Sequence, residues 1–484
     1  MRLSRTALPH LAREVARPGH DPAALRTGIV HLGVGVFHRA HLASYTDAVL
    51  ARDPRWGILG ASLRHADVRD ALAPQDCLYA LALRDGTERA PRVIGAHTGL
   101  VVAPEDPAAL VARMAAPEVA IVSLTVTEKG YCRAAGGDLD MAHPDIAADL
   151  ATPERPRSVP GFLAAALAAR RRADISPFTV LSCDNLPHNG AALRRVVSQF
   201  ATLTDPDLAA WIAEAVVFPS TMVDRIVPAT TSSDCAGVAA SLGAEDAWPV
   251  IAEPFTQWVL EEGFPLGRPA WEEAGATLVS DVRPWEEMKL RLLNGSHSAI
   301  AYLGQLAGWE TVAEAIAEPA LASTVAALMA EVVPSLSMPA GVDVAGYARA
   351  VLARFANPAL RHRTAQIAAD GSQKLPQRLL APARMLLASG CVPKRIALAL
   401  AAFIRLCQGR ADDGSAIALS DPEAAALRRR ASRAGTSVER VRAVLWLPAL
   451  DAADLARDER FVAAVAGALE ALALGGVRAV LAAA

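Results

Sequence analysis

A buried strand that runs straight into a glycine turn and a helix is the feature that most constrains this fold. Residues 28–32, GIVHL, have the apolar pattern of a buried strand, and GVGVFHRAH follows at 33–41. In this order the elements form the start of a dinucleotide-binding unit, where glycines let the backbone approach a pyrophosphate. The common pattern G-x-G-x-x-G is incomplete, because Gly33 and Gly35 are present but His38 takes the third position. Taken alone, the glycine pair also fits an ordinary turn.

Strand and helix patterns alternate over the first half of the chain, which predicts a mostly parallel sheet covered by helices. The predicted strands are residues 28–35, 56–63, 92–102, 119–127 and 177–183. The segment 246–261 is expected to add strands at an edge of the sheet. After about residue 282 these patterns stop, and alanine-rich amphipathic helices continue to the end. We therefore predict an α/β fold, with a Rossmann-type domain at 1–281 and an all-α domain at 282–484.

Composition excludes several classes of protein. With 52% apolar and 20% charged residues, a chain of 484 residues can form domains with large cores. A net charge of −3 gives no excess of positive charge for a nucleic acid or a membrane surface, and the longest apolar runs, such as 396–404, are too short to cross a bilayer. The six cysteines form no C-x-x-C pair, which argues against a disulfide framework or a structural zinc. We expect a cytoplasmic monomer or small homo-oligomer that binds no metal.

The segment 283–304 is a predicted helix that carries polar residues where a core helix would have alanine or leucine. Lys289, Asn294 and His297 are expected to lie toward one side of it, and Gly304 is expected to end it. Only four of the 48 Lys and Arg residues are lysines, so a retained lysine is a candidate for a position that needs a titratable amine. The alternative is a glycine kink with solvated polar groups.

Two further loops place polar side chains directly after predicted strands, where ligands bind in open α/β sheets. The loop 181–190 contains Asp184, Asn185 and His188, and the loop 123–132 contains Thr125, Thr127, Glu128 and Lys129. Each loop by itself fits a turn, but together with the glycine turn they indicate one cleft.

The residues after the second strand are compatible with either NAD or NADP as the cofactor. Asp67 is a candidate for the ribose hydroxyls, although it lies farther from the glycines than is usual, and a helix cap is an equal alternative. Arg64 nearby would instead favour a 2′-phosphate. The sequence therefore predicts NAD, with NADP as the alternative.

Six segments occur in an order that carries a more specific resemblance. They are GVGVFHRAH, TVTEKGYC, SCDNLPHNG, FPSTMVDRIVPAT, EPFTQWVLE and EMKLRLLNGSH. Together they resemble the mannitol dehydrogenase family of polyol-specific long-chain dehydrogenases over nearly the whole chain. In that family the turn itself reads G-x-G-x-F-H-R-A-H, so the missing third glycine is normal there. The resemblance implies hydride transfer, without metal, between a nicotinamide and C2 of an open-chain sugar derivative.

The resemblance also assigns catalytic roles. Lys289 would be the general base that takes the alcohol proton, with a pKa lowered toward neutrality by burial. Asn185 and Asn294 would hold the developing alkoxide, and His297 would hydrogen-bond the reacting or a neighbouring hydroxyl. A lysine and two asparagines would thus replace the Lewis acid of a zinc enzyme.

The resemblance extends to cofactor and substrate contacts. Asp224, Lys129 and Lys374 are expected to contact the substrate, with pairing to Glu128 or to cofactor phosphates as the alternative for Lys129. The expected cofactor-binding residues are Gly33, Gly35, Phe37, His38, Arg39, Asp67 and Thr125. Among these, Phe37 would pack the helix start onto the sheet. His38 and Arg39 would face the phosphates or the cleft, with simple packing of the helix on the sheet as the alternative.

The substrate branch rests on fewer residues. The segments TEKGYC and QIAADGSQKLPQR look more like the branch that acts on mannonate and fructuronate than like the mannitol branch. The cations Lys129, Lys374 and Arg378 would suit the carboxylate of a sugar acid. Mannitol, arabinitol and the tagaturonate–altronate pair remain alternatives, because a fold and a family do not fix the substrate.

Overall fold

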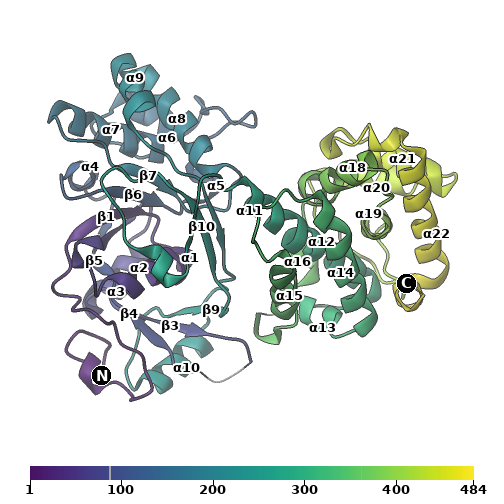
Figure 1. Cartoon of the computed structure of the whole chain (residues 1–484), viewed down its shortest axis with the longest axis horizontal. Helices are drawn as coiled ribbons and strands as arrows, with labels where there is room; N and C mark the ends of the chain where they lie inside the picture. Colours follow the sequence, from purple (N-terminus) through teal and green to yellow (C-terminus); the bar gives the residue numbers. More distant parts are fainter. Residues whose placement is uncertain (87–88, 361, 484) are drawn as a thin grey trace. The chain divides into compact units, whose positions relative to one another are not determined.

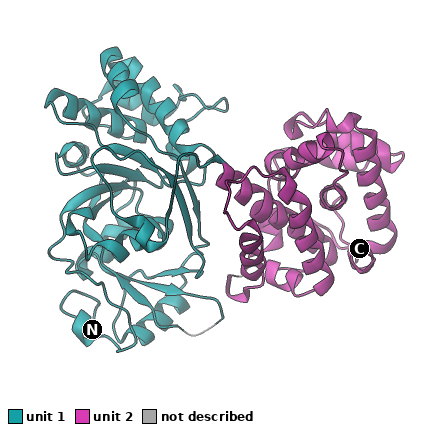
Figure 2. Ribbon diagram, in the orientation of Figure 1, with its two compact units in different colours: residues 1–283 teal, residues 284–484 magenta. Residues whose placement is uncertain are grey.

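The structure is a computed structural model that describes residues 1–86, 89–360 and 362–483. It divides into two compact units, Met1–Arg283 and Pro284–Ala484 (Figure 2). The first unit combines sheets with helices, whereas the regular elements in the described part of the second unit are all helical (Figure 1). The predicted Rossmann-type sheet followed by an all-α region is therefore confirmed.

The main sheet of the first unit has five parallel strands in the order β5-β2-β1-β6-β7. Their bounds are Thr27–Leu32 (β1), Gly57–Ser62 (β2), His97–Val102 (β5), Ile121–Leu124 (β6) and Thr179–Ser182 (β7). The chain moves outward from β1 to one side and then returns to the other, so the strand order reverses between β1 and β6. Ligands bind at the carboxyl ends of the strands at such a reversal. The glycine turn directly follows β1 and lies at this point.

Both faces of the main sheet are buried, which explains why its strands are continuous apolar runs. Alternate residues of β1 enter different hydrophobic clusters, Val30 with Phe162 and Ile29 with Ala43. Figure 1 shows α7 and α8 on one side of this sheet and α1 and α2 on the other. The helices of the first unit are Val36–Ala40 (α1), Leu42–Val49 (α2), Asp67–Leu72 (α3), Pro107–Ala115 (α4), Thr127–Gly130 (α5), Pro144–Ala151 (α6), Val159–Arg172 (α7), Asn189–Thr204 (α8), Pro206–Ala215 (α9) and Ser232–Leu242 (α10).

Two three-stranded sheets, in the orders β4-β3-β9 and β11-β10-β8, accompany the main sheet. Their strands are Tyr79–Leu83 (β3), Arg92–Ile94 (β4), Thr221–Asp224 (β8), Val250–Ala252 (β9), Gln257–Glu261 (β10) and Thr277–Val279 (β11). The prediction that 246–261 adds strands to the edge of the main sheet is wrong, because β9 pairs with β3 and β10 pairs with β8 and β11. An apolar pattern predicts a strand but does not identify its partner.

The predicted single strand at 92–102 is also wrong, because β4 and β5 belong to different sheets. The buried carboxylate of Asp47, on α2, holds the chain where it changes sheet. It accepts a hydrogen bond from Gly95 N at 2.8 Å and pairs with Arg92 at 2.6 Å. The break therefore depends on a residue far away in the sequence.

The second unit is built around α19, whose residues Ile396, Leu400 and Phe403 are fully buried. This helix packs against α12, α14 and α22. The helices are Arg283–Met288 (α11), Gly295–Ala307 (α12), Val312–Ile316 (α13), Pro319–Val332 (α14), Val344–Phe355 (α15), Thr364–Ala368 (α16), Gly371–Leu375 (α17), Ala381–Ala388 (α18), Lys394–Cys407 (α19), Ala424–Ala431 (α20), Ser437–Leu445 (α21) and Glu459–Ala482 (α22). Two π-helical turns, Lys289–Asn294 and Pro376–Leu380, interrupt this α-helical pattern.

One helix of the described chain, α22, is long and apolar enough to cross a membrane by length and composition. It packs against α19 and α21 and buries Phe461, Val465 and Leu469. Its backbone leaves helical geometry at Gly476, where φ is 70°. These contacts are those of a helix that forms part of the core of the second unit.

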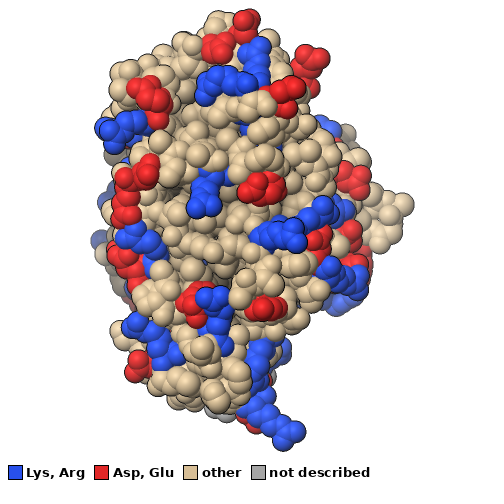
Figure 3. Space-filling view, turned by 90° about the vertical axis from the view of Figure 1, so that its left-hand side faces the viewer, with Lys and Arg blue, Asp and Glu red and all other residues tan. Residues whose placement is uncertain are grey.

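Charged side chains are interspersed on the face shown in Figure 3, where Lys and Arg alternate with Asp and Glu. Several arginines pair with carboxylates nearby in the sequence, such as Arg55 with Asp53 at 2.7 Å. Exposed pairs of this kind contribute little to stability, because water and salt screen them.

Three buried histidines form a cluster beneath the glycine turn. The rings of His31 and His38 are stacked with centroids 3.6 Å apart, and His38 Nε2 is hydrogen-bonded to His97 Nε2 at 3.0 Å. Burial lowers the pKa of His31 to about 3 and that of His97 to about 3, and it lowers the pKa of His38 well below its ordinary value. All three rings are therefore neutral at pH 7, and the cluster does not accommodate a proton.

We predict that this cluster makes the protein sensitive to acid. The unfolded chain binds these protons near pH 6.5, whereas the folded protein does not, so the free energy of unfolding is largest above pH 6.5 and falls as the pH is lowered. Each such histidine contributes a slope of up to about 1.4 kcal/mol per pH unit. Urea unfolding between pH 7.5 and 5 measures it, and His38→Gln should reduce the slope. The matched control His65→Gln, at an exposed histidine, should not reduce the slope of the free energy of unfolding against pH. Equal slopes in the two variants would contradict the prediction.

Candidate functional site

A cavity of about 610 Å³ lies at the carboxyl ends of β1, β2 and β6 in the first unit. Its walls come from the glycine turn, from the residues after β2, from the residues after β6 and from the start of α7. The residues that line it include Gly33, Gly35, Ser62, Arg64, Asp67, Thr125, Thr127, Lys129, Arg157, Ser158 and Trp248. This is the place that the strand order indicates for a ligand.

The two glycines of the turn, Gly33 and Gly35, lack a side chain for different reasons. At Gly33 the backbone has φ +94°, and a Cβ there would overlap the carbonyl oxygen of Thr125. Thr125 Oγ1 in turn donates to Gly33 O at 2.8 Å, which ties the end of β1 to the end of β6. A Cβ at Gly35 would meet nothing within 4 Å. Gly33 therefore allows the two strands to meet, while Gly35 leaves open space at the cavity.

Phe37, His38 and Arg39 are not among the residues that line this cavity. His38 and Arg39 are fully buried, and Arg39 donates to Trp248 O at 2.6 Å. Phe37 is partly buried against the core of the first unit and stacks on His41 at 5.0 Å. The expectation that His38 and Arg39 face the cofactor is therefore corrected. Both side chains are buried in the core, as the alternative of helix–sheet packing predicts.

The loop after β6 is held by a buried carboxylate, Asp184, whose position after a strand the sequence indicated but whose role it did not. Asp184, directly after β7, accepts hydrogen bonds from Val126 N at 3.1 Å and Thr127 N at 2.8 Å. Tyr131 also donates to it at 3.1 Å, and burial raises the pKa of the Asp184 carboxyl. Its neighbour Asn185 is exposed. The sequence signal was present, since Asp184 follows a strand, but its partners are distant in the chain.

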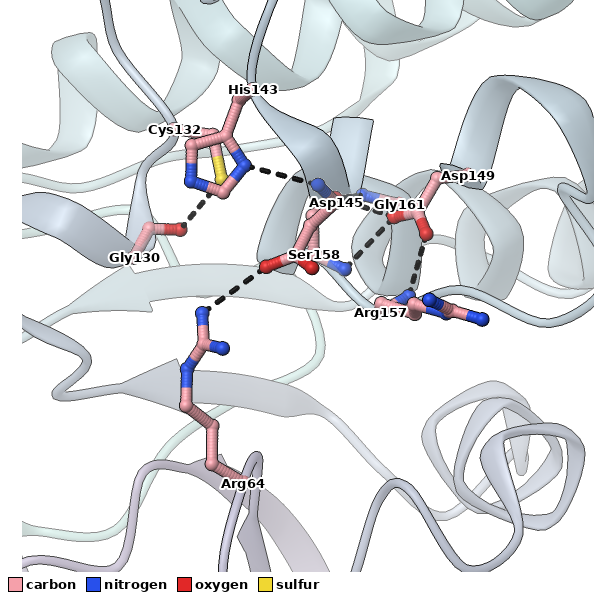
Figure 4. A network of polar contacts seen from close by, with 9 residues as sticks. All are labelled: Arg64, Gly130, Cys132, His143, Asp145, Asp149, Arg157, Ser158 and Gly161. Atoms are coloured by element: carbon pink, nitrogen blue, oxygen red, sulfur yellow. Dashed lines mark hydrogen bonds and ion pairs between the residues drawn. The ribbon is translucent and has the colours of Figure 1, made fainter. Parts of the chain in front are cut away.

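A second network of polar contacts supports the part of the cavity wall that Arg157 and Ser158 form (Figure 4). The buried carboxylate of Asp149 accepts from Arg157 N at 2.7 Å and from Ser158 N at 2.9 Å and Oγ at 2.6 Å. Ser158 also caps α7 by accepting from Gly161 N at 3.0 Å. These contacts fix the backbone of Arg157, which lines the cavity. The motif Ser-Val-Pro before an apolar helix was the sequence signal for this cap.

Arg64 and Asp67 lie in the same cavity, together with Lys129. Arg64 pairs with Asp145 at 3.1 Å, as Figure 4 shows. Arg64 and Asp145 also line an adjoining cavity of about 770 Å³. Asp67 is the first residue of α3, which begins without a side-chain capping bond. Lys129 and the glycine turn line the same cavity, and the role of Lys129 stays a prediction.

Lys289, Asn294 and His297 lie on consecutive turns of one helical segment in the second unit. Lys289 and Asn294 are the first and last residues of the π-helical turn, and Gly295 N closes it by donating to Leu290 O. Residues five apart point to different sides of a regular α-helix of 3.6 residues per turn, whereas a π turn returns them to one side. The predicted end at Gly304 is wrong, because α12 continues to Ala307 and ends at Gly308, where φ is +81°.

His297 packs against Phe355 with ring centroids 4.4 Å apart and lies 5.9 Å from His362. Burial lowers the pKa of His297 well below its ordinary value, and the charges of His362, Arg354 and Arg378 lower it further. His297 is therefore a neutral imidazole with one N–H donor and one acceptor nitrogen. Such a ring can hydrogen-bond a hydroxyl in either direction.

Lys374 lies just before the second π-helical turn, which packs against the first. Its Nζ donates to Ala369 O at 2.6 Å, and burial is the main cause that lowers its pKa. The two remaining positions, Asn185 and Asp224, lie in the first unit, where Asp224 is the buried last residue of β8. Because each unit is described by itself, the meeting of these residues in one active site stays a prediction.

Comparison with known proteins tests the resemblance that the sequence carries. Residues 27–273 match the mannitol dehydrogenase Rossmann domain, and residues 281–473 match the mannitol dehydrogenase C-terminal domain. The chain belongs to the mannitol dehydrogenase family. The family assignment and the oxidoreductase class that follows from it are thus confirmed.

Relatives in the family differ in the substrate that their names give. The D-mannonate oxidoreductase of Escherichia coli K12 is 45% identical over 471 residues, which are 96% of this chain and 97% of the relative. A mannitol 2-dehydrogenase of Cereibacter sphaeroides is 42% identical over 477 residues, 97% of this chain and 99% of the relative. Identity alone therefore does not choose between a sugar acid and a polyol.

Solved structures of similar chains support the same family fold. The mannitol 2-dehydrogenase of Pseudomonas fluorescens, in ternary complex with NAD and D-mannitol, matches with a TM-score of 0.82 at 39% identity and covers 100% of this chain and 99% of that chain. A D-sorbitol dehydrogenase in substrate-free form matches with a TM-score of 0.93 at 34% identity. The match covers 99% of this chain and 100% of that chain.

The two glycines of the turn should respond differently to substitution. Gly33→Ala should lower the free energy of unfolding by at least about 2 kcal/mol, because the left-handed backbone is unfavourable and the methyl group overlaps Thr125 O. Gly35→Ala should leave stability within about 0.5 kcal/mol and weaken the binding of NADH, because its methyl group only occupies open cavity space. Urea unfolding and NADH fluorescence titration measure the two effects. Equal stability of the two variants would contradict this account of the turn.

Proposed function

We propose that this protein is an NAD-dependent dehydrogenase that interconverts D-mannonate and D-fructuronate at the carbon that is C2 of the ketose. The observation that carries the proposal is the helical segment with Lys289, Asn294 and His297, which offers a base, an amide and a neutral imidazole. The acid substrate is supported by the relative named D-mannonate oxidoreductase and by the cations Lys374 and Arg378. The alternative is D-mannitol and D-fructose, or a related arabinitol or altronate substrate.

The cavity of the first unit suits NAD. Its volume of about 610 Å³ lies within the range of cofactor sites, and Gly35 leaves room for a pyrophosphate where a Cβ would stand. Lys129 and Arg157 supply positive charge for the phosphates, and Asp67 supplies a carboxylate for ribose hydroxyls. Arg64 keeps NADP as the alternative, although its pair with Asp145 partly neutralises it. When bound, the nicotinamide accepts or donates the hydride at the substrate carbon.

The groups of this chain then perform the proton and charge chemistry. The proton of the substrate hydroxyl moves to Nζ of Lys289, which is buried on the same helical segment. The oxygen becomes an alkoxide, and the side-chain amides of Asn185 and Asn294 donate hydrogen bonds to it. His297 binds the reacting or a neighbouring hydroxyl and fixes the orientation of the sugar chain. In the reverse direction Lys289 returns the proton to the oxygen.

Removal of the base should abolish turnover without affecting the cofactor cavity. Lys289→Met should lower kcat by about 10²–10⁴-fold, since no other group takes the proton, and leave the Kd for NADH unchanged. Lys394, exposed at the start of α19, is the matched control, and Lys394→Met should keep full activity. Absorbance of NADH measures turnover. Full activity of Lys289→Met would remove Lys289 from the mechanism.

The substrate assignment is tested by the same absorbance with D-mannonate, D-mannitol, D-arabinitol and D-altronate, each with NAD and with NADP. We expect the largest kcat/KM for D-mannonate with NAD. A larger kcat/KM for D-mannitol would reverse the choice of substrate. No turnover of any pair would contradict the proposed function as a whole.

A further inference from the structure

Arg378 is a largely buried cation whose guanidinium is only partly used by the fold. It lies on the second π-helical turn, and its Nη1 donates to Asn294 O at 3.3 Å and to Ser298 Oγ at 3.2 Å. Among the described residues, no carboxylate pairs with it, and Nε and Nη2 have no hydrogen-bond partner. Neither of these two nitrogens is fully enclosed, so each keeps some surface that the protein does not cover.

Two other buried arginines, Arg170 and Arg291, have a different environment. Arg170 donates to three backbone carbonyls, among them Ser176 O at 2.7 Å. Arg291, in the first π-helical turn, pairs with Glu287 at 3.1 Å and donates to Ser335 O. Their roles are structural, since the protein itself satisfies the charge or the donors. Arg378 differs from these two, because the protein bonds one of its nitrogens and leaves the other edge of the guanidinium unpaired.

The surroundings of Arg378 favour an anion. The charges that act on His297 beside it are those of His362, Arg354 and Arg378 itself. Burial is the main cause that lowers the pKa of Arg378, and the charge of Arg378 also lowers the pKa of Lys374. A buried cation is unfavourable unless an opposite charge pairs with it. A negative group on the substrate would provide that charge.

We propose that the Nε–Nη2 edge of Arg378 binds the carboxylate of the sugar acid and makes the enzyme select the acid over the neutral polyol. The two N–H groups of this edge are parallel and match the two oxygens of a carboxylate, which lysine cannot reproduce. The inference deepens the proposed function and rests on it.

The position of Arg378 suits the chemistry of the substrate. In fructuronate the carboxylate is at the opposite end of the chain from the ketone, so its binding group is separate from the group that holds the alkoxide. Arg378 contacts the main chain of Asn294 and the hydroxyl of Ser298 on the next turn. The amide of Asn294 thus remains available for the alkoxide, while the guanidinium is fixed beside it.

The test compares two substrates in the same variants of the full-length enzyme with NAD. Arg378→Gln should reduce the ratio of kcat/KM for D-mannonate to kcat/KM for D-mannitol by about 30- to 1000-fold, the loss expected for a bidentate charged pair. Arg378→Lys should give a smaller reduction, because it keeps the charge but not the paired donors. Arg384→Gln on α18, where the arginine pairs with Asp454 at 2.7 Å, is the matched control and should leave the ratio unchanged.

Each outcome decides between the proposals. Equal loss for both substrates would overturn the inference and would show that Arg378 only positions Asn294. A wild-type enzyme that oxidises D-mannitol and not D-mannonate would overturn the inference and the acid assignment but keep the dehydrogenase. No turnover of either substrate would contradict the proposed function itself. Thermal unfolding identifies a misfolded Arg378→Gln protein, and the ratio measured for Arg378→Lys then decides the question.

Discussion

The close approach of Gly33 to the carbonyl of Thr125 is the contact on which the cavity depends. It joins the end of β1 to the end of β6, at the point where the strand order reverses. Because these ends meet, the residues that follow β6 lie beside the glycine turn, and Asp184 holds them there through two backbone N–H groups. The histidine cluster lies beneath the turn and keeps it in place. A side chain at Gly33 would disturb all of these contacts at once.

The candidate catalytic residues of the second unit depend on a different backbone feature. Lys289 and Asn294 are the first and last residues of a π-helical turn, whose wider turn is expected to bring residues five apart toward one side of the helix. A second π-helical turn packs against the first, and a Cβ at Gly295 would lie only 3.0 Å from Arg378 O. Such turns are less stable than regular helix and occur often at functional sites. Here Arg378 and Ser298 satisfy the Asn294 carbonyl in the altered backbone.

Much of the fold could be predicted from the sequence, because strand and helix periods are local properties of the chain. The alternation of strand and helix patterns in the first half predicted the Rossmann-type sheet. The amphipathic helices after residue 282 predicted the all-α unit. The partners of β9 and β10 could not be predicted, since pairing depends on distant strands. For the same reason, the sequence placed His38 and Arg39 at the cofactor, whereas tertiary burial directs them into the core.

The sequence by itself determined the family, the fold class and the types of group available for the chemistry. Only tertiary structure decided how these groups are arranged, because the decisive contacts join residues far apart in the chain. Asp149 fixes the wall at Arg157, Asp184 fixes the loop after β6, and Arg378 reaches the main chain of Asn294. The helical pattern also concealed the π-helical turn, since its extra residue changes the backbone and not the composition.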